Sequence, residues 1–185
     1  MVPYRCGHHP QRPEGSHCLV GGQSLTVMGK LKRLVVHCTA TPEGREVSSD
    51  EIRRWHTAPL SAGGRGWKQV GYTDMVHLDG SVERLVPNNG DGTVDPWEVT
   101  NGAAGYNSTS LHVVYVGGVG KDGKTPKDTR TGEQKEALRC YVRDFLYRHP
   151  GVEVVGHHDL NPGKACPCFD VKKEYKQLVN KIKRQ

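Results

Sequence analysis

The sequence lacks the long apolar runs on which membrane proteins are built. Hydrophobic residues make up 35% of the 185 residues, and the mean hydropathy is -0.65. Because a helix needs about 20 consecutive apolar residues to span a bilayer, a membrane protein is excluded. The beginning of the chain also lacks the basic start and apolar stretch of a secretory signal. We therefore expect a cytoplasmic protein that leaves the producing cell only if something else releases it.

Two further absences narrow the class of protein. The sequence shows no internal repeat, and a chain of this length fits one domain that can bury its own core. It also contains no HExxH motif, so no helix offers a glutamate base between paired histidine ligands. This absence argues against a metalloprotease of the thermolysin type.

The excess of positive charge is confined to the end of the chain. Residues 172–185 hold six lysines and arginines against one glutamate, a net charge of +5, whereas the remainder holds 20 basic and 19 acidic residues. Such a distribution does not indicate a phosphate-binding face across the domain. We expect no nucleic-acid partner, although the basic end favours an anionic surface.

Cysteine use points away from a disulfide framework. The six cysteines are Cys6, Cys18, Cys38, Cys140, Cys166 and Cys168. Without an export signal, metal ligation or simple burial is favoured over disulfides. The cysteines and histidines of residues 1–29 fit no zinc-finger spacing, and no hydrophobic pattern there supports a fold. We predict a disordered leader over residues 1–29 and a domain over residues 30–185.

Strand signals recur along that domain. The apolar, β-branched segments "LKRLVVHCT", "TSLHVVYVGG" and "VEVVG" predict buried strands. The pair Asp79-Gly80 lies between "VGYTDMVHL" and "SVERLV" and predicts a hairpin.

Helix signals separate these strands. Ser48 and Glu51 have the spacing of a capping box, with Ile52 and Trp55 on one helical face. Apolar stripes at helical spacing follow in residues 131–149 and in residues 171–182. The order of elements predicts a single α/β domain whose central mixed β-sheet is flanked by helices.

Candidate metal ligands are concentrated after two of the strands. Alternation places His37 and Cys38 on opposite faces, so only one of them can reach a given ion; the pattern slightly favours His37. By the same argument His157 and His158 should point to different sides. Cys166 and Cys168 bracket a proline, and in an extended segment both can face one way. The residues alone therefore leave two histidines and two cysteines for two ligand positions.

Four blocks carry a resemblance to a known family. The segments "VVHCTAT", "GYTDMVHLDGSVE", "GYNSTSLHVVYVGG" and "GHHDLNPGKACPCFDV" resemble the zinc-dependent N-acetylmuramoyl-L-alanine amidases of phage-lysozyme type, a superfamily that includes the peptidoglycan recognition proteins. The similarity covers about residues 31–171, in the order and spacing of the family. It implies a hydrolase that cuts the amide between N-acetylmuramic acid and L-alanine in peptidoglycan.

The resemblance also implies the roles of five residues. Zn²⁺ would be bound by His37, His157 and Cys166, and Tyr72 and Lys164 would be the catalytic residues. A zinc ion so bound lowers the pKa of its water, and donors beside it can stabilise the oxyanion. The remaining histidines are expected to be surface or satisfied core residues, His158 with a further option as a supporting residue. These are His56, His77, His112, His149 and His158.

The chain departs from the family pattern in two places. Thr73 and Asp74 stand where the family often has histidine and phenylalanine, and residues 101–103 replace a common His-Ala pair. Both places are expected to lie in or near the substrate groove and to affect peptide preference. The polar insert of residues 87–99 could line that groove through Trp97, or be a surface loop anchored by Trp97.

Three functions are thus in view. The resemblance favours a monomeric zinc amidase, an endolysin of phage or prophage origin that acts on the cell wall after release. The alternative is a non-catalytic module that binds muropeptides, which the presence of Cys166 disfavours. A third hypothesis is a regulator that binds a polymerase or another protein, and no residue in the sequence supports it.

Overall fold

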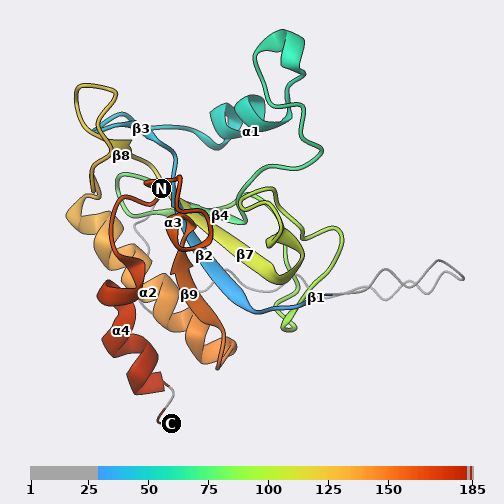
Figure 1. Ribbon diagram of the computed structural model, residues 1–185, viewed down its shortest axis with the longest axis vertical. Coiled ribbons are helices and arrows are strands. Elements are labelled where there is room, and N and C mark those ends of the chain that lie inside the picture. The colour runs from blue at the N-terminus through green and yellow to red at the C-terminus, as the bar shows by residue number, and fades with distance from the viewer. Residues whose placement is uncertain (1–28, 183, 185) are drawn as a thin grey trace, which may run out of the picture.

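A mixed five-stranded sheet forms the centre of the protein (Figure 1). The computed structural model describes residues 29–182 and residue 184. The strand order is β5-β4-β7-β2-β9, and the bounds are Val82–Arg84, Asp74–Val76, Ser110–Tyr115, Arg33–Cys38 and Glu153–Gly156. Neighbouring strands run parallel except β5, which is antiparallel to β4. The predicted mixed sheet is confirmed, and the three segments predicted as buried strands form β2, β7 and β9.

Strands β2 and β7 are mostly apolar because both of their faces are covered. In the register of β2 and β7, His37 lies opposite Val114 and Cys38 opposite Tyr115. The imidazoles of His37 and His112 are nevertheless buried in this apolar environment. A buried polar side chain is unfavourable without a partner, so these two histidines mark the part of the sheet that serves more than packing.

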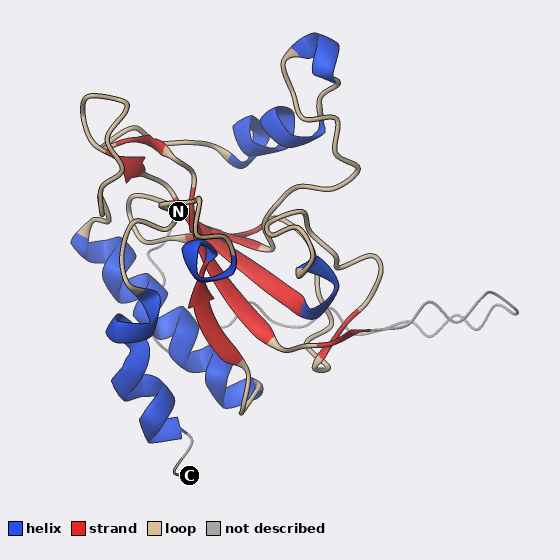
Figure 2. Cartoon of the chain, in the orientation of Figure 1, coloured by secondary structure: helices blue, strands red, loops and turns tan. Residues whose placement is uncertain are grey.

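One face of the sheet is covered by α2 (Gly132–Arg148) and α4 (Val171–Ile182), which lie beside each other (Figure 2). Their apolar stripes pack on inward-facing side chains of the sheet that include Val36, Val113 and Tyr115. Both predicted helices are confirmed. Cys38 belongs to this helix-covered side, as strand alternation predicts.

The opposite face of the sheet packs against α1 (Ser49–Thr57) and the loops around it. The predicted capping box is present: the Ser48 hydroxyl accepts from the Glu51 N–H, and the Glu51 carboxylate accepts from the Ser48 N–H. Ile52 is buried in the second apolar cluster, with Trp55 packed against it. His37 projects to this side, because it alternates with Cys38 along β2.

Short elements complete the fold. Gly29–Lys30 (β1) pairs with Thr93–Val94 (β6), and Thr41–Pro42 (β3) pairs with Gly118–Val119 (β8). The 3₁₀ turns are Leu60–Ala62 (η1) and Asn107–Thr109 (η2), and His157–Leu160 forms the one-turn helix α3. The predicted hairpin joins β4 to β5, and its turn requires glycine because Gly80 has a φ of 78°.

Two sequence expectations need correction or refinement. Asp74 does not line a groove: its carboxylate is buried on the helix side, where it accepts from Tyr141 of α2 at 2.6 Å and from Arg84. The insert of residues 87–99 is closed by Glu98, which is buried and accepts from the backbone N–H groups of Asn89 and Asp95. Trp97 itself is half exposed, and its roles as a groove residue or as the anchor of the loop stay predictions.

The predicted leader lies outside the described residues apart from Gly29, which belongs to β1. The domain boundary at residue 30 therefore stays a prediction. Within residues 29–182, no helix is both long and apolar enough to cross a bilayer.

Candidate metal centre

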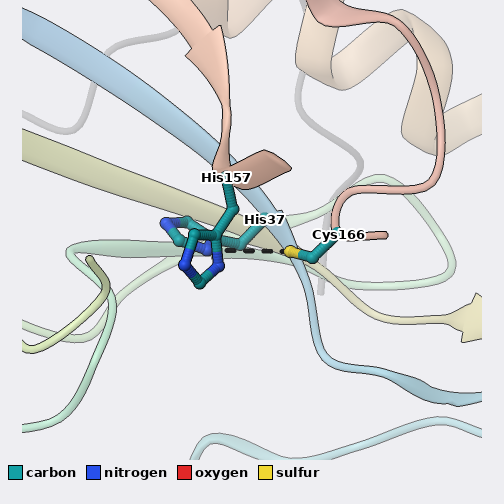
Figure 3. A group of neighbouring side chains, drawn as sticks. All are labelled: His37, His157 and Cys166. Atoms are coloured by element: carbon teal, nitrogen blue, oxygen red, sulfur yellow. Dashed lines mark hydrogen bonds between the residues drawn. The ribbon is translucent and has the colours of Figure 1, made fainter. Parts of the chain in front are cut away.

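The carboxyl ends of two neighbouring parallel strands bring the candidate ligands together. His37 is near the end of β2, and His157 follows directly after β9 as the first residue of α3. Cys166 comes from the loop after α3 and completes the group (Figure 3). One ligand atom from each of the three side chains lies within 4.8 Å of the other two.

These three donors fit a zinc ion in both chemistry and spacing. Two imidazole nitrogens and a thiolate are a common zinc ligand set, and three protein ligands leave a fourth tetrahedral position open. Usual zinc–ligand lengths place a nitrogen and a sulfur on one ion about 3.6 Å apart. The observed distance from His37 Nδ1 to Cys166 Sγ is 3.7 Å.

The surroundings of His37 and His157 lower the pKa values of both imidazoles. Burial, followed by the influence of His112 and His157, holds the pKa of His37 well below its usual value. Burial and the positive charge of Lys164 lower the pKa of His157. Because a metal ligand must be a deprotonated nitrogen, the site offers two ligand lone pairs at neutral pH.

Backbone hydrogen bonds hold Cys166 against β2 and α3. The Cys38 N–H donates to Cys166 Sγ at 3.2 Å, and the His158 N–H donates to the Cys166 carbonyl at 2.8 Å. An N–H donor to a ligand sulfur fixes its orientation, so the first of these bonds supports Cys166 as a ligand.

Cys168 faces away from this group. The expectation of an extended segment is wrong, because Cys168 has a φ of 71° and its N–H closes a turn onto the Ala165 carbonyl. Its sulfur lies 4.0 Å from Cys38 Sγ and 3.1 Å from the Gly118 carbonyl, on the helix side of the sheet. Cys166 and Cys168 are both free thiols, whereas Cys140 is disulfide-bonded, against the expectation for the cysteines as a set.

The strand argument for His157 and His158 is likewise wrong, because both belong to α3. Their side chains still diverge. The ring of His157 lies 4.8 Å from the His37 ring, whereas His158 Nε2 lies 3.9 Å from a carboxylate oxygen of Asp159.

Tyr72 and Lys164 border the ligand group. The Tyr72 ring lies 5.2 Å from the His37 ring and edge-on to the ring of His56. Burial raises the pKa of the Tyr72 phenol, and Cys166 and Cys38 raise it further, so the hydroxyl stays protonated and can donate. Lys164 is exposed and close enough to His157 to lower its pKa.

Sequence reasoning missed one contact of the site. His112 was expected to be an ordinary surface or core residue, yet its Nδ1 lies 3.0 Å from His37 Nε2. Its own Nε2 is buried and has no hydrogen-bond partner among the described residues. A histidine inside the otherwise apolar run "LHVVYV" was the available signal.

Three other histidines are satisfied or packed as expected. His56 Nδ1 accepts from the Gly71 N–H, and His77 contacts the carboxylates of Glu46 and Glu83. His149 is buried beside the Phe145 ring.

Comparison with known proteins decides the family. Residues 28–169 match the family described as N-acetylmuramoyl-L-alanine amidase. The chain belongs to this family. The amidase is 35% identical over 157 residues to the endolysin of Klebsiella phage KP32, across 84% of this chain and 93% of that protein. It is also 35% identical over 148 residues to the endolysin of Escherichia phage T7, across 79% and 87% of the two chains.

Solved structures share the fold of the amidase. The amidase LysC from Clostridium intestinale URNW superposes with a TM-score of 0.59 at 18% identity, over 86% of this chain and 94% of LysC. The ectodomain complex of peptidoglycan recognition proteins LCa and LCx, bound to tracheal cytotoxin, gives 0.58 at 19% identity, over 85% and 89%. These likenesses confirm the predicted α/β architecture.

Family membership also confirms the activity that the resemblance implied: the protein is an N-acetylmuramoyl-L-alanine amidase.

Proposed function

We propose that this amidase is a zinc-dependent endolysin that hydrolyses the bond between N-acetylmuramic acid and L-alanine in peptidoglycan. The observation that carries the zinc dependence is the convergence of His37, His157 and Cys166 on one point, with ligand atoms within 4.8 Å of one another. Zinc bound there would lower the pKa of a water in the open position to near neutrality and polarise the amide carbonyl.

The residues around this point supply the rest of the chemistry. The Tyr72 hydroxyl, kept protonated by burial, can donate a hydrogen bond to the oxygen of the amide carbonyl as negative charge develops on it. Lys164 is exposed and close enough to His157 to lower its pKa, so its ammonium can attract the same charge. Tyr72 is therefore assigned as a neutral donor and Lys164 as a cationic one.

The assignment as an endolysin is supported by the relatives. They are endolysins of phages, and the similarity to this chain covers most of their length. In this role the amidase would accumulate in the cytoplasm and act on the wall after release. The lysines spread along α4, which are Lys172, Lys173, Lys176 and Lys181, suit an anionic wall polymer.

Digestion of purified sacculi tests the proposal. The protein is incubated with sacculi in the presence of zinc or of a chelator, and new chain ends are identified by mass spectrometry. We expect free amino groups on L-alanine, with intact glycan strands, only in the zinc sample. Intact sacculi under zinc-replete conditions, with muropeptide binding retained, would instead identify a binding module.

A further inference from the structure

We propose that His112 is a positioning residue for the metal centre, which holds the imidazole of His37 in the orientation and tautomer that metal binding requires. This inference rests on the proposed zinc site. It concerns a residue of β7 that is not one of the three candidate ligands.

The first observation is how the two nitrogens of His37 are used. Nδ1 faces Cys166 Sγ at 3.7 Å, whereas Nε2 lies 3.0 Å from His112 Nδ1. The metal position is thus on the Nδ1 side of the ring, and His112 contacts the opposite nitrogen. A ligand histidine is normally held in this way through its second nitrogen, although the usual partner is a carboxylate or a carbonyl.

The hydrogen-bond chain fixes the protons. A metal-binding Nδ1 carries no hydrogen, so His37 carries its hydrogen on Nε2 and donates it to His112 Nδ1. His112 must then be the tautomer protonated on Nε2. In the reverse arrangement, with His112 Nδ1–H as the donor, a neutral His37 would be protonated on Nδ1 and could not bind the metal.

The second observation is that burial and backbone hydrogen bonds hold His112 in place. It is fully buried, and β7 fixes its backbone: the His112 N–H donates to the Thr73 hydroxyl, and the Thr73 N–H donates to the His112 carbonyl. A buried imidazole with a single hydrogen bond is unfavourable as a mere core residue.

The third observation is the space made for its ring. A Cβ atom on Gly102 would lie 2.4 Å from His112 Nδ1 and 2.7 Å from its Cγ, and also 2.6 Å from the Gly71 carbonyl oxygen. Gly102 does not have a positive φ, so its backbone does not require glycine. The absence of a side chain at position 102 therefore makes room for the His112 imidazole, at the nitrogen that contacts His37, as well as for the Gly71 carbonyl.

Two substitutions separate positioning from packing. His112→Val fills the strand position with an apolar side chain but removes the acceptor. His112→Asn places an amide oxygen close to where Nδ1 lies and so restores an acceptor. Val116→Ala, a buried change in the cluster on the same side of the sheet, is the matched control for lost packing alone.

Two measurements are made on each variant. Nitrogen-15 NMR of the zinc-free protein reports the tautomer of His37, and competition with a chromophoric chelator reports the zinc dissociation constant. We expect His37 in the Nε2–H tautomer in wild type, His112→Asn and Val116→Ala, and a mixture in His112→Val. We expect His112→Val to weaken zinc binding about 10–100-fold, with most of the affinity recovered in His112→Asn.

The outcomes distinguish this inference from the proposed site. Unchanged zinc affinity and an unchanged His37 tautomer in His112→Val would overturn the positioning role while leaving the metal centre in place. Equal weakening in Val116→Ala would also overturn it, since packing would then explain the effect. A wild-type protein that binds no zinc would overturn the proposed centre and the inference together.

Discussion

At the scale of single residues, two cysteines two positions apart have different surroundings. Cys166 Sγ lies 3.7 Å from His37 Nδ1 and accepts the Cys38 N–H, whereas Cys168 Sγ contacts the Gly118 carbonyl on the far side of the sheet. Strand alternation was sufficient to separate His37 from Cys38 in the sequence. It could not separate the second pair, because a turn at Cys168 replaces the extended backbone that the argument assumed.

Serine substitutions of the two cysteines should therefore have opposite results. Cys166→Ser removes a proposed ligand and should weaken zinc binding by more than the about 10–100-fold typical of losing a supporting partner. Cys168→Ser keeps a donor for the Gly118 carbonyl and should retain zinc and most of the activity. Zinc content after dialysis and sacculus hydrolysis measure both effects; loss of zinc only in Cys168→Ser would show that the ligand is misassigned.

Tyr72→Phe tests the oxyanion donor. The ring stays beside His37 and His56, but the hydroxyl is lost, so the catalytic rate should fall about 10²–10³-fold. Zinc affinity should not change, because no proposed ligand is altered. A steady-state assay on soluble muropeptides separates kcat from KM; a rate equal to that of wild type removes Tyr72 from the mechanism.

The buried His56 predicts a pH dependence of stability. Burial lowers the pKa of His56 from its ordinary value of 6.5 to about 4. Between these values the unfolded chain takes up a proton that the folded chain does not, so stability falls as the pH drops from 6.5 towards 4.

Denaturation of the zinc-free protein across this pH range measures the effect. His56→Asn keeps an acceptor for the Gly71 N–H but cannot titrate, so the pH slope should decrease by about the uptake of one proton. Ile52→Val, a buried change on the same helix, should lower stability equally at every pH. An unchanged slope in His56→Asn would show that His56 titrates normally in the folded protein.

At the scale of elements, short sequence patterns correctly predicted the helices and the hairpin that they specify. The capping box at Ser48, the Asp79-Gly80 hairpin and the apolar stripes of α2 and α4 all formed as expected. The one-turn helix α3 has no such signal, since four residues carry no periodicity. The direction of Asp74 was missed because its partners, Arg84 and Tyr141, lie on other elements.

The hydrogen bonds of Asp74 with Arg84 and Tyr141 join α2 to the sheet, and the effect of losing one of them can be measured. Tyr141→Phe removes the donor to the buried Asp74 carboxylate and should lower the free energy of unfolding by about 1–3 kcal/mol. Tyr147→Phe, at a half-exposed position of the same helix, should change it by less than about 0.5 kcal/mol. Equal stability of both variants in urea denaturation would show that the bond contributes nothing.

At the scale of the whole molecule, the metal centre exists only because distant segments meet. His37 and Cys166 are 129 residues apart in the sequence, and His37 and His112 are 75 apart. Besides His37, the residues alone left two histidines and two cysteines as candidates for two ligand positions. The family resemblance chose among these four. The contact of His112 with His37 depends on the parallel pairing of β2 and β7 and on the space at Gly102, which no local pattern encodes.

Zinc titration of the metal-free protein tests the central claim most directly. Free amino groups on L-alanine, released from sacculi, are counted as zinc is added in steps to a fixed amount of protein. We predict that the rate rises in proportion to zinc and levels off at one ion per chain, and that Cys166→Ser stays at background throughout. A metal-free protein that already cleaves at the full rate, or cleavage at any other bond, would contradict the account.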